Sequence, residues 1–291
     1  MSVTRSPVKN YLSLIKFSHT VFALPFAMIG FFLGLRMTTA QFSVLLLVEV
    51  IGCMVFARSA AMAFNRYIDR RFDAANPRTA VREIPAGIIS SRNALIFVIL
   101  NCVLFVAITW FINPVCFWLS PVALVIILGY SLTKRFTAFC HLVLGVGLSL
   151  APIGAFLAVT GKFNLLPLLY SFTVLFWVSG FDMIYALQDE AFDRSQNLRS
   201  MPVWLGLRGS LFLSALSHLI AAGLVILAGY LAHFGSWYWT GAGLFIALLI
   251  YQHRLVKPDD LSKVNLAFMT TNGIASLLFA FFVILELVQR A

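Results

Sequence analysis

Long apolar segments constrain the fold of this chain more than any other feature of its sequence. Nine of them follow one another, and most approach the ~20 residues that an α-helix needs to cross a bilayer. They cover about 16–36, 42–66, 94–112, 115–132, 140–160, 165–187, 210–231, 236–252 and 266–288. Because lipid offers no hydrogen bonds to a backbone, spanning segments form helices. We therefore expect an all-α integral membrane protein with nine transmembrane helices.

The charged residues support the same class and predict an orientation. Only 11% of the residues are charged, whereas soluble globular proteins carry roughly 25%. With nine spans and a cytoplasmic N-terminus, only Arg36, Lys162 and Arg290 of the 21 basic residues would lie outside. This asymmetry predicts that loops 67–93 and 188–209 face the cytoplasm. The membrane that we expect is the cytoplasmic (inner) membrane of a bacterium. Basic loops facing anionic lipid also account for the net charge of +10, so we expect no nucleic-acid partner.

An amide and two carboxylates recur every four residues where the second apolar segment ends. Asn65, Asp69 and Asp73 share one helical face, because each such step turns a helix by only about 40°. Carboxylates at this spacing repel each other, so a cation is expected between them. Mg²⁺ typically takes one or two carboxylates together with substrate phosphates. Arg58 lies two turns earlier on the same face.

The same spacing returns later in the chain, in Tyr185, Asp189 and Asp193, and Asp182 lies two turns before Asp189. A basic loop follows each motif, which indicates an internally duplicated chain. The simpler alternative is a pair of solvated, charged helix ends. The repeated spacing and the high cost of carboxylates near a bilayer favour the binding of a metal and a diphosphate instead.

Basic residues near both motifs are candidates for holding a phosphate or a carboxylate, which suit the planar fork of arginine. They are Arg78, Arg82, Lys134, Arg135 and Arg199. Taken alone, Lys134 and Arg135 would be read as anchors whose charged ends reach the membrane interface. The acidic motifs on the same side favour contact with a diphosphate or a carboxylate.

Two other classes of membrane protein place acids among apolar helices. An ion-coupled transporter would need its acids along a pathway near the middle of the bilayer, whereas these gather at one face. A CDP-alcohol phosphotransferase would contain an Asp-x₂-Asp-Gly-x₂-Ala-Arg run, which this sequence lacks. The ion-coupled transporter is kept as the alternative from another functional class.

Taken together, the motifs resemble the UbiA superfamily of intramembrane prenyltransferases over nearly the whole chain. The resemblance rests on Asn65-x₃-Asp69-x₃-Asp73, Tyr130-x₃-Lys134, and Asp182 followed by Tyr185-x₃-Asp189-x₃-Asp193. The Arg58 flank, the Pro-Arg-Thr…Ile-Pro-Ala-Gly loop and the Tyr-Ala-Leu-Gln-Asp run are most similar to the 4-hydroxybenzoate polyprenyltransferase branch. The opening Lys16-Phe-Ser-His-Thr-Val-Phe-Ala-Leu-Pro-Phe is also shared with prenyltransferases of the futalosine route to menaquinone, so both types of acceptor stay open.

The resemblance implies a single prenyltransferase domain over residues 1–291. Its helices would surround a central cavity that is capped by cytoplasmic loops and open sideways to lipid. It further implies a Mg²⁺-dependent enzyme that joins a polyprenyl diphosphate to 4-hydroxybenzoate or a similar aromatic acid, with release of diphosphate, in ubiquinone or menaquinone biosynthesis. The isoprenoid chain length and the oligomeric state are left open.

The resemblance also implies roles for individual residues. One Mg²⁺ would be held by Asn65, Asp69 and Asp73, and the other by Asp189 and Asp193. The diphosphate would be held by Arg78, Arg82, Lys134 and Arg199. The acceptor would be bound by Arg58, Arg135, Tyr130 and Tyr185, with its carboxylate on one of the two arginines. The catalytic aspartates would be Asp69, Asp73, Asp182, Asp189 and Asp193. Asp182 has two open roles, as the partner of a buried group such as Arg58 or as the group that orients the acceptor or takes its proton.

Overall fold

Every regular element in the described part of the chain, residues 7–15 and 22–289, is a helix in this computed structural model. The long helices are α2 Leu24–Arg36, α3 Val44–Ile68, α5 Ser91–Ile112, α6 Pro114–Thr133, α7 Cys140–Thr160, α8 Leu165–Ala186, α10 Met201–Leu231, α11 Ser236–Leu255 and α12 Asn272–Gln289. The short ones are α1 Pro7–Leu14, α4 Arg70–Ala75, the 3-10 turn η2 Leu187–Asp189, α9 Glu190–Ser195 and the π-helix η3 Leu266–Thr271. The start of the first predicted span, at 16–21, lies outside the described residues.

Seven of the predicted spans correspond to helices that are long and apolar enough to cross a membrane. The chain is therefore an integral membrane protein. Two further predicted spans are also helical, but α2 has only 13 residues, and α11, with 20, is less apolar. The prediction of an all-helical membrane protein is confirmed for the described residues, whereas the count of nine spans stays a prediction.

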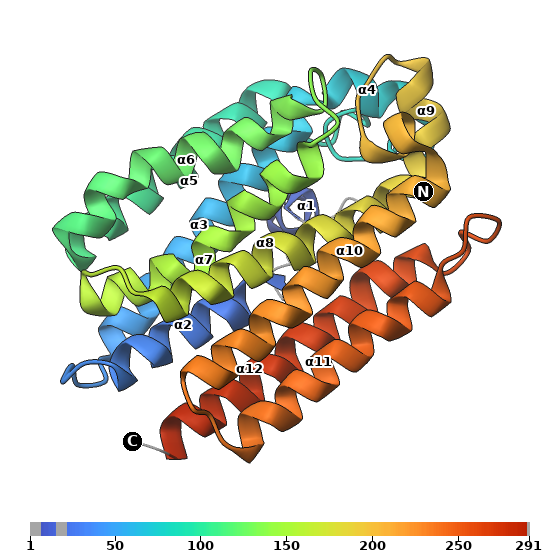
Figure 1. Cartoon of the computed structure of the whole chain (residues 1–291). Helices are drawn as coiled ribbons and strands as arrows, with labels where there is room; N and C mark the ends of the chain where they lie inside the picture. Colours follow the sequence, from blue (N-terminus) through green and yellow to red (C-terminus); the bar gives the residue numbers. More distant parts are fainter. Residues whose placement is uncertain (1–6, 16–21, 290–291) are drawn as a thin grey trace.

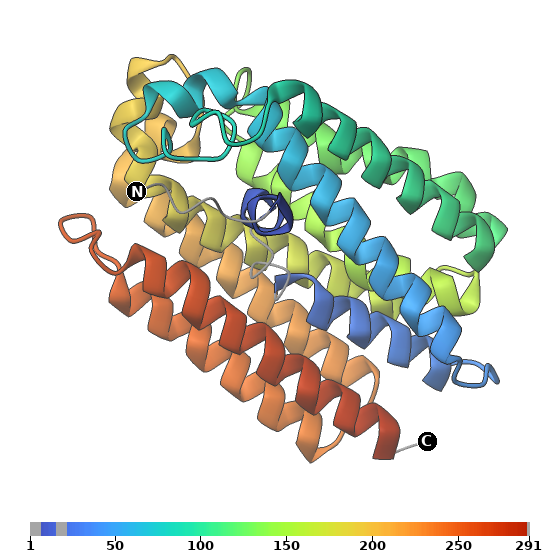
Figure 2. The same ribbon diagram turned by 180° about the vertical axis from the view of Figure 1, so that it is seen from behind.

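The long helices lie alongside one another in a bundle (Figure 1). Contacts are most extensive between α8 and α10, α7 and α8, α3 and α5, and α2 and α7. The pair α7 and α8 therefore joins the helices that carry the first motif to those that follow the second. The short helices α4 and α9 lie close together at one end of this bundle, and Figure 2 shows the loop after α4 beside α9 from behind. This end is called the cap below.

Aromatic rings fill the interior between α2, α8, α11 and α12. Phe26, Trp177, Phe245 and Phe279 are completely buried. The ring centroids of Trp177 lie 5.3 Å from Phe26 and 5.8 Å from Phe245, which in turn lies 5.2 Å from Phe279. The indole N–H of Trp177 donates to Asn272 Oδ1 at 2.8 Å, so its polar atom is satisfied inside the apolar core.

Capping side chains explain why two helices start before the predicted apolar segments. Ser90 Oγ accepts the backbone N–H of Asn93 at 3.2 Å ahead of α5, and Asn113 Oδ1 accepts that of Cys116 at 2.9 Å ahead of α6. Polar caps of this kind lie outside the hydrophobic pattern. α10 also begins before the predicted position 210, and it passes through a break at Gly206, whose φ is 69°.

A glycine in α7 permits a close approach to α8. A Cβ atom placed on Gly145 would lie 2.5 Å from the carbonyl oxygen of Leu175 and 2.5 Å from Ser179 Oγ. Small residues at such crossings let membrane helices pack with their backbones close together. Gly154, on the same helix, has open space around its Cβ position.

We predict that Gly145→Ala destabilises the bundle by about 1–3 kcal/mol, the usual cost of overpacking a filled interior. The matched control is Gly154→Ala, which adds the same methyl group and the same helix propensity without a clash. Thermal unfolding of both variants in detergent should show a lower midpoint for Gly145→Ala only. Equal midpoints would contradict the close approach of α7 and α8.

Candidate functional site

The two acidic motifs have the same local form. Asp69 alone separates α3 from α4, and η2, which ends at Asp189, separates α8 from α9. Both α4 and α9 have six residues, and in each the fourth residue is a buried aspartate, Asp73 or Asp193. The spacing-based prediction of one continuous helical face missed these breaks.

An arginine from the loop after the first motif binds the second motif. Arg78 Nε lies 3.1 Å from Asp189 Oδ1, and its Nη2 lies 2.5 Å from Oδ2, a two-pronged contact that suits the guanidinium geometry. Its Nη1 donates to the hydroxyl of Tyr185 at 3.1 Å. Asn76 Oδ1 accepts the backbone N–H of Arg78 at 3.0 Å and so shapes the loop. The two motifs, which are far apart in the sequence, therefore meet at the cap.

The other three motif aspartates also face basic side chains. Arg135 Nη2 lies 2.9 Å from Asp69 Oδ1, Arg82 Nη1 lies 2.6 Å from Asp73 Oδ1, and Lys134 Nζ lies 2.7 Å from Asp193 Oδ2. Acidic and basic groups thus alternate across the cap. Three of the predicted diphosphate-binding residues thus contact predicted metal ligands, whereas the partner of Asp69 is Arg135, which was predicted to bind the acceptor.

The environment shifts the pKa of several groups at the cap. Burial raises the pKa of Asp69 to about 6, although the charge of Arg135 opposes this shift. Burial alone would lower the pKa of Lys134, but Asp193 raises it above its ordinary value. Burial would also lower the pKa of Arg78, but the hydrogen bonds and the charge of Asp189 raise it above its ordinary value. Both basic groups therefore stay charged at neutral pH.

The oxygen-rich donor set of the motifs fits a hard divalent cation. Within residues 7–15 and 22–289, no three His, Cys, Asp or Glu side chains are close enough together to hold a metal ion by themselves. Mg²⁺ needs fewer, because one or two carboxylates suffice when a substrate phosphate completes the shell. Asp73 Oδ2 is buried and has no hydrogen-bond partner in the described structure, and its nearest cation is Arg66 Nη1 at 3.9 Å. Asn65 donates to Asp69 through its amide nitrogen at 3.1 Å, which leaves its oxygen for another ligand.

A second group of polar side chains lies deeper in the bundle. Tyr130 on α6 interacts electrostatically with Asp182, Asp69 and Arg58. Arg58 Nε is buried without a hydrogen-bond partner among the described residues. This group brings together Arg58 and Tyr130, both predicted to bind the acceptor, with Asp182, whose predicted role is catalytic.

His141 also belongs to this group, and the sequence analysis did not single it out. Its Nδ1 lies 2.7 Å from Asp182 Oδ2, and its Nε2 accepts the backbone N–H of Met201 at 3.4 Å. His141 is the second residue of α7, whereas Asp182 is on α8. Nothing in the periodicity of either segment indicates how these two helices pair.

Arg199 behaves differently from the other predicted diphosphate-binding residues. Its side chain donates to the carbonyl oxygen of Phe136 at 2.8 Å, and its backbone N–H donates to that of Lys134 at 2.7 Å. These bonds join the loop after the second motif to the end of α6. Arg199 therefore lies at the cap, but it contacts backbone rather than a motif aspartate.

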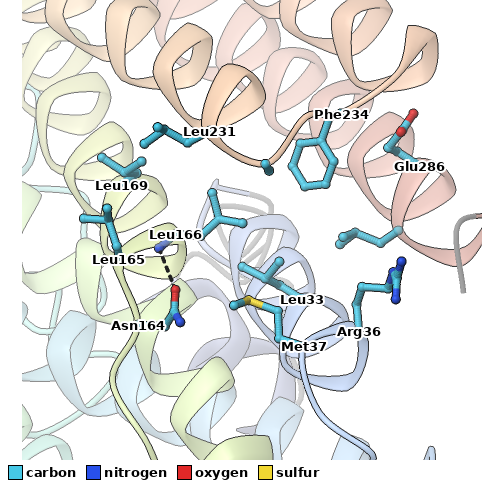
Figure 3. Close-up of a pocket in the computed structure, with 12 residues that line it drawn as sticks. Leu33, Arg36, Met37, Asn164, Leu165, Leu166, Leu169, Leu231, Phe234 and Glu286 are labelled. Carbon is cyan, nitrogen blue, oxygen red and sulfur yellow. Dashed lines mark hydrogen bonds between the residues drawn. The ribbon is translucent and has the colours of Figure 1, made fainter.

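Hollows lie at both ends of the bundle in the described part of the chain. The first, of about 400 Å³, lies at the end opposite the cap and is lined mainly by leucines, with Arg36 and Glu286 among its polar residues (Figure 3). The two acidic motifs are at the other end of the bundle, so a ligand bound in this hollow would not contact them. The second, of about 530 Å³, lies at the cap and is lined by Ile68, Arg70, Arg71, Phe72, Arg135 and Gln196.

Comparison with known proteins identifies relatives of the whole bundle. The model of the UbiA prenyltransferase family matches residues 23–282. A protein of Nitrosospira multiformis named 4-hydroxybenzoate octaprenyltransferase is 32% identical over 248 residues, which are 85% of this chain and 84% of that protein. A protein of the same name from Tolumonas auensis is 31% identical over 236 residues, 81% of this chain and 82% of that protein.

Solved structures share the fold. A UbiA homolog from Aeropyrum pernix K1, determined in its apo form, superposes with a TM-score of 0.80 and 29% identity, covering 94% of this chain and 98% of that one. A UbiA homolog from Archaeoglobus fulgidus bound to GPP and Mg²⁺ has a TM-score of 0.76 and 20% identity, covering 96% of this chain and 99% of that one. At that identity the second likeness concerns the fold alone.

We predict that Arg78→Gln loosens the contact between the two motifs, because glutamine cannot reproduce the two-pronged contact with Asp189. Hydrogen exchange of backbone amides in loop 76–89 and around η2 should accelerate by up to about tenfold. Arg71→Gln is the control, because Arg71 is an exposed arginine of the same cap with no ion pair among the described residues. Unchanged exchange in Arg78→Gln would show that other contacts hold the cap together.

Proposed function

The chain belongs to the UbiA prenyltransferase family, and from this premise we propose that it joins a polyprenyl diphosphate to 4-hydroxybenzoate or a similar aromatic acid, with release of diphosphate, in quinone biosynthesis. The observation that carries the proposal is the cap, where four aspartates of the two motifs alternate with basic side chains at one end of a membrane-spanning bundle. The names of the curated relatives support the aromatic acid as acceptor.

At the cap, the motif residues would hold the diphosphate through Mg²⁺. Asn65, Asp69 and Asp73 would bind one ion, and Asp189 and Asp193 the other. When bound, Mg²⁺ neutralises the negative charge that grows on the departing diphosphate. The basic side chains that pair with the motif aspartates already lie at the cap, namely Arg78, Arg82 and Lys134. They would turn from the carboxylates to the diphosphate oxygens as the substrate binds. Arg199 would support them by holding the loop that follows the second motif.

The reaction requires charge separation in surroundings that contain little water. The allylic C1–O bond breaks, and its electron pair leaves with the diphosphate. A carbon of the electron-rich ring then forms a bond to C1, and the ring proton at that carbon leaves to restore aromaticity. Apolar helices around the site limit the access of water, which would otherwise capture the allylic cation.

The deeper polar group fits the aromatic acid. Arg58 and Asp182 each lie seven residues before a motif residue, Asn65 or Asp189, and so about 10 Å farther along the helix axis. A buried guanidinium suits the carboxylate of the acceptor, and the carboxylate of Asp182 suits its hydroxyl group. Tyr130 and Tyr185 would line the space between the cap and this level, and Arg135 is the second candidate for the acceptor carboxylate.

The proposal also includes the orientation of the protein in its membrane and the route by which each substrate arrives. The cap would face the cytoplasm of a bacterium, across its inner membrane, because the basic loops gather there. The isoprenoid tail would enter from the lipid bilayer, while the aromatic acid and Mg²⁺ would arrive from water. The stretch beginning at Lys16, which resembles prenyltransferases of the futalosine route, favours an acceptor of menaquinone biosynthesis as the second candidate. A panel of aromatic acids offered with several polyprenyl diphosphates separates the two candidates.

We predict that Asp69→Asn and Asp189→Asn each lower Mg²⁺-dependent transfer by about 100-fold or more, because each removes a carboxylate next to the developing charge. Product formation from a polyprenyl diphosphate and 4-hydroxybenzoate is measured in membranes that hold the full chain. Glu190→Gln is the control, because Glu190 adjoins Asp189 but pairs with Arg194 at 2.6 Å on the outside of the cap. Turnover at the wild-type rate in either aspartate variant would refute the metal assignment.

We predict that Arg58→Ala raises the KM for an anionic acceptor by about tenfold to 100-fold, the range expected for losing hydrogen bonds to a charged group. The KM for the polyprenyl diphosphate should change little. A neutral analogue, the methyl ester of the same acid, should show a much smaller difference between wild type and variant. If the KM for the acid is unchanged, its carboxylate is bound elsewhere, and Arg135→Ala is then the variant to measure.

A further inference from the structure

Asp182 has a single hydrogen-bond partner in the described structure, and that partner is a histidine. His141 Nδ1 lies 2.7 Å from Asp182 Oδ2. The other carboxylate oxygen, Oδ1, has no hydrogen bond among the described residues, and 22% of the side-chain surface is accessible. One oxygen is therefore fixed by the protein, while the other is available to a ligand.

The contact with Met201 decides how the proton is placed on the imidazole. His141 Nε2 lies 3.4 Å from the backbone nitrogen of Met201, and a backbone N–H can only donate. A neutral imidazole that accepts this N–H at Nε2 carries its hydrogen on Nδ1, and a protonated imidazole carries one there as well. In either state Nδ1–H donates to Asp182 Oδ2.

These contacts exclude His141 as the group that acts on a substrate. Only 3% of its side chain is accessible, and its two ring nitrogens face Asp182 and the backbone nitrogen of Met201. Any action on the aromatic acid must pass through the accessible oxygen of Asp182. The effect left to His141 is to hold that carboxylate in one orientation, because a carboxylate on a single flexible bond otherwise rotates.

The histidine also joins the deeper polar group to the cap. Met201 follows Ser200, whose hydroxyl donates to Asp193 Oδ2 at 3.2 Å. Two consecutive residues thus contact the second acidic motif and His141. The orientation of Asp182 is tied, through His141, to the loop that holds Asp193.

We propose that His141 is a positioning residue that holds Asp182 ready for the hydroxyl group of the aromatic acceptor and keeps it in register with the loop at Asp193. The inference rests on the proposed prenyl transfer and deepens it, because it names the residue that sets the acceptor end of the site. It follows from the two contacts of the imidazole and from the free oxygen of Asp182.

The test compares two variants that differ in one hydrogen-bond donor. In His141→Asn, the amide nitrogen occupies roughly the place of Nδ1 and can still donate to Asp182. In His141→Leu, a side chain of similar volume cannot donate at all. Both variants lose the contact with Met201 N–H, so a difference between them reports on Asp182. Steady-state kinetics with a polyprenyl diphosphate and 4-hydroxybenzoate are measured in membranes holding the full chain, together with thermal unfolding of each purified variant.

The proposal predicts that His141→Leu lowers kcat/KM for the acceptor by about tenfold to 100-fold while the KM for the diphosphate stays within about twofold. His141→Asn should recover most of this loss. In an Asp182→Asn background, His141→Leu should have little further effect, because the carboxylate it positions is gone.

Three results would overturn the inference. One is a His141→Leu variant with wild-type acceptor kinetics, and another is a folded His141→Asn variant that loses acceptor turnover. The third is a parallel rise in the KM values of both substrates, which indicates general loosening. If the wild-type chain neither binds nor prenylates any aromatic acid of the panel, the proposed function itself fails and takes this inference with it. The two failures are therefore distinguishable.

Discussion

Charged groups at the edge of a membrane bundle must be paired, and this requirement governs the arrangement of the cap. An uncompensated carboxylate near hydrocarbon is costly, and two carboxylates on one helical face add mutual repulsion. The chain meets both demands with its own basic side chains. Asp73, only 6% exposed, has Arg82 beside it, and Asp193, 1% exposed, has Lys134. In the proposed reaction, magnesium and a diphosphate would replace these pairs with new ones and would leave no charge unpaired.

Pairing also explains how two halves of one chain form one site. The helix break before α4 and the 3-10 turn before α9 send the ends of both motifs into short helices at the cap rather than farther along the bundle axis. Arg78, from the loop that follows the first motif, then binds Asp189 of the second. Lys134 and Arg135, adjacent in sequence, bind one aspartate from each motif. The site is thus shared between the halves, and neither half holds all of its parts.

The sequence predicted the helices well because hydrophobic length is a local property. The sequence also predicted that the charged residues gather at one end of the bundle. That prediction needs only the spacing of four residues within each motif and the alternating direction of successive spans. The breaks at Asp69 and η2 and the early start of α10 were missed, because a one-residue break, a 3-10 turn and the kink at Gly206 leave the apolar periodicity unchanged. His141 was missed for another reason. Its partner Asp182 is 41 positions away on a different helix, and only the packing of α7 against α8 brings them together.

The depth of each polar group matches the origin of the molecule it would bind. The aspartates lie at the cap, where the proposed ions and diphosphate would meet water, whereas Arg58 and Asp182 lie about 10 Å deeper along their helices than Asn65 and Asp189. Beyond them, Phe26, Trp177, Phe245 and Phe279 close the interior with packed rings. This filled core limits how far an acceptor can enter, so the aromatic acid would stop at the level of Arg58 and Asp182. The isoprenoid tail of a bound diphosphate would then lie towards lipid, where an apolar chain is stable, rather than at the polar cap.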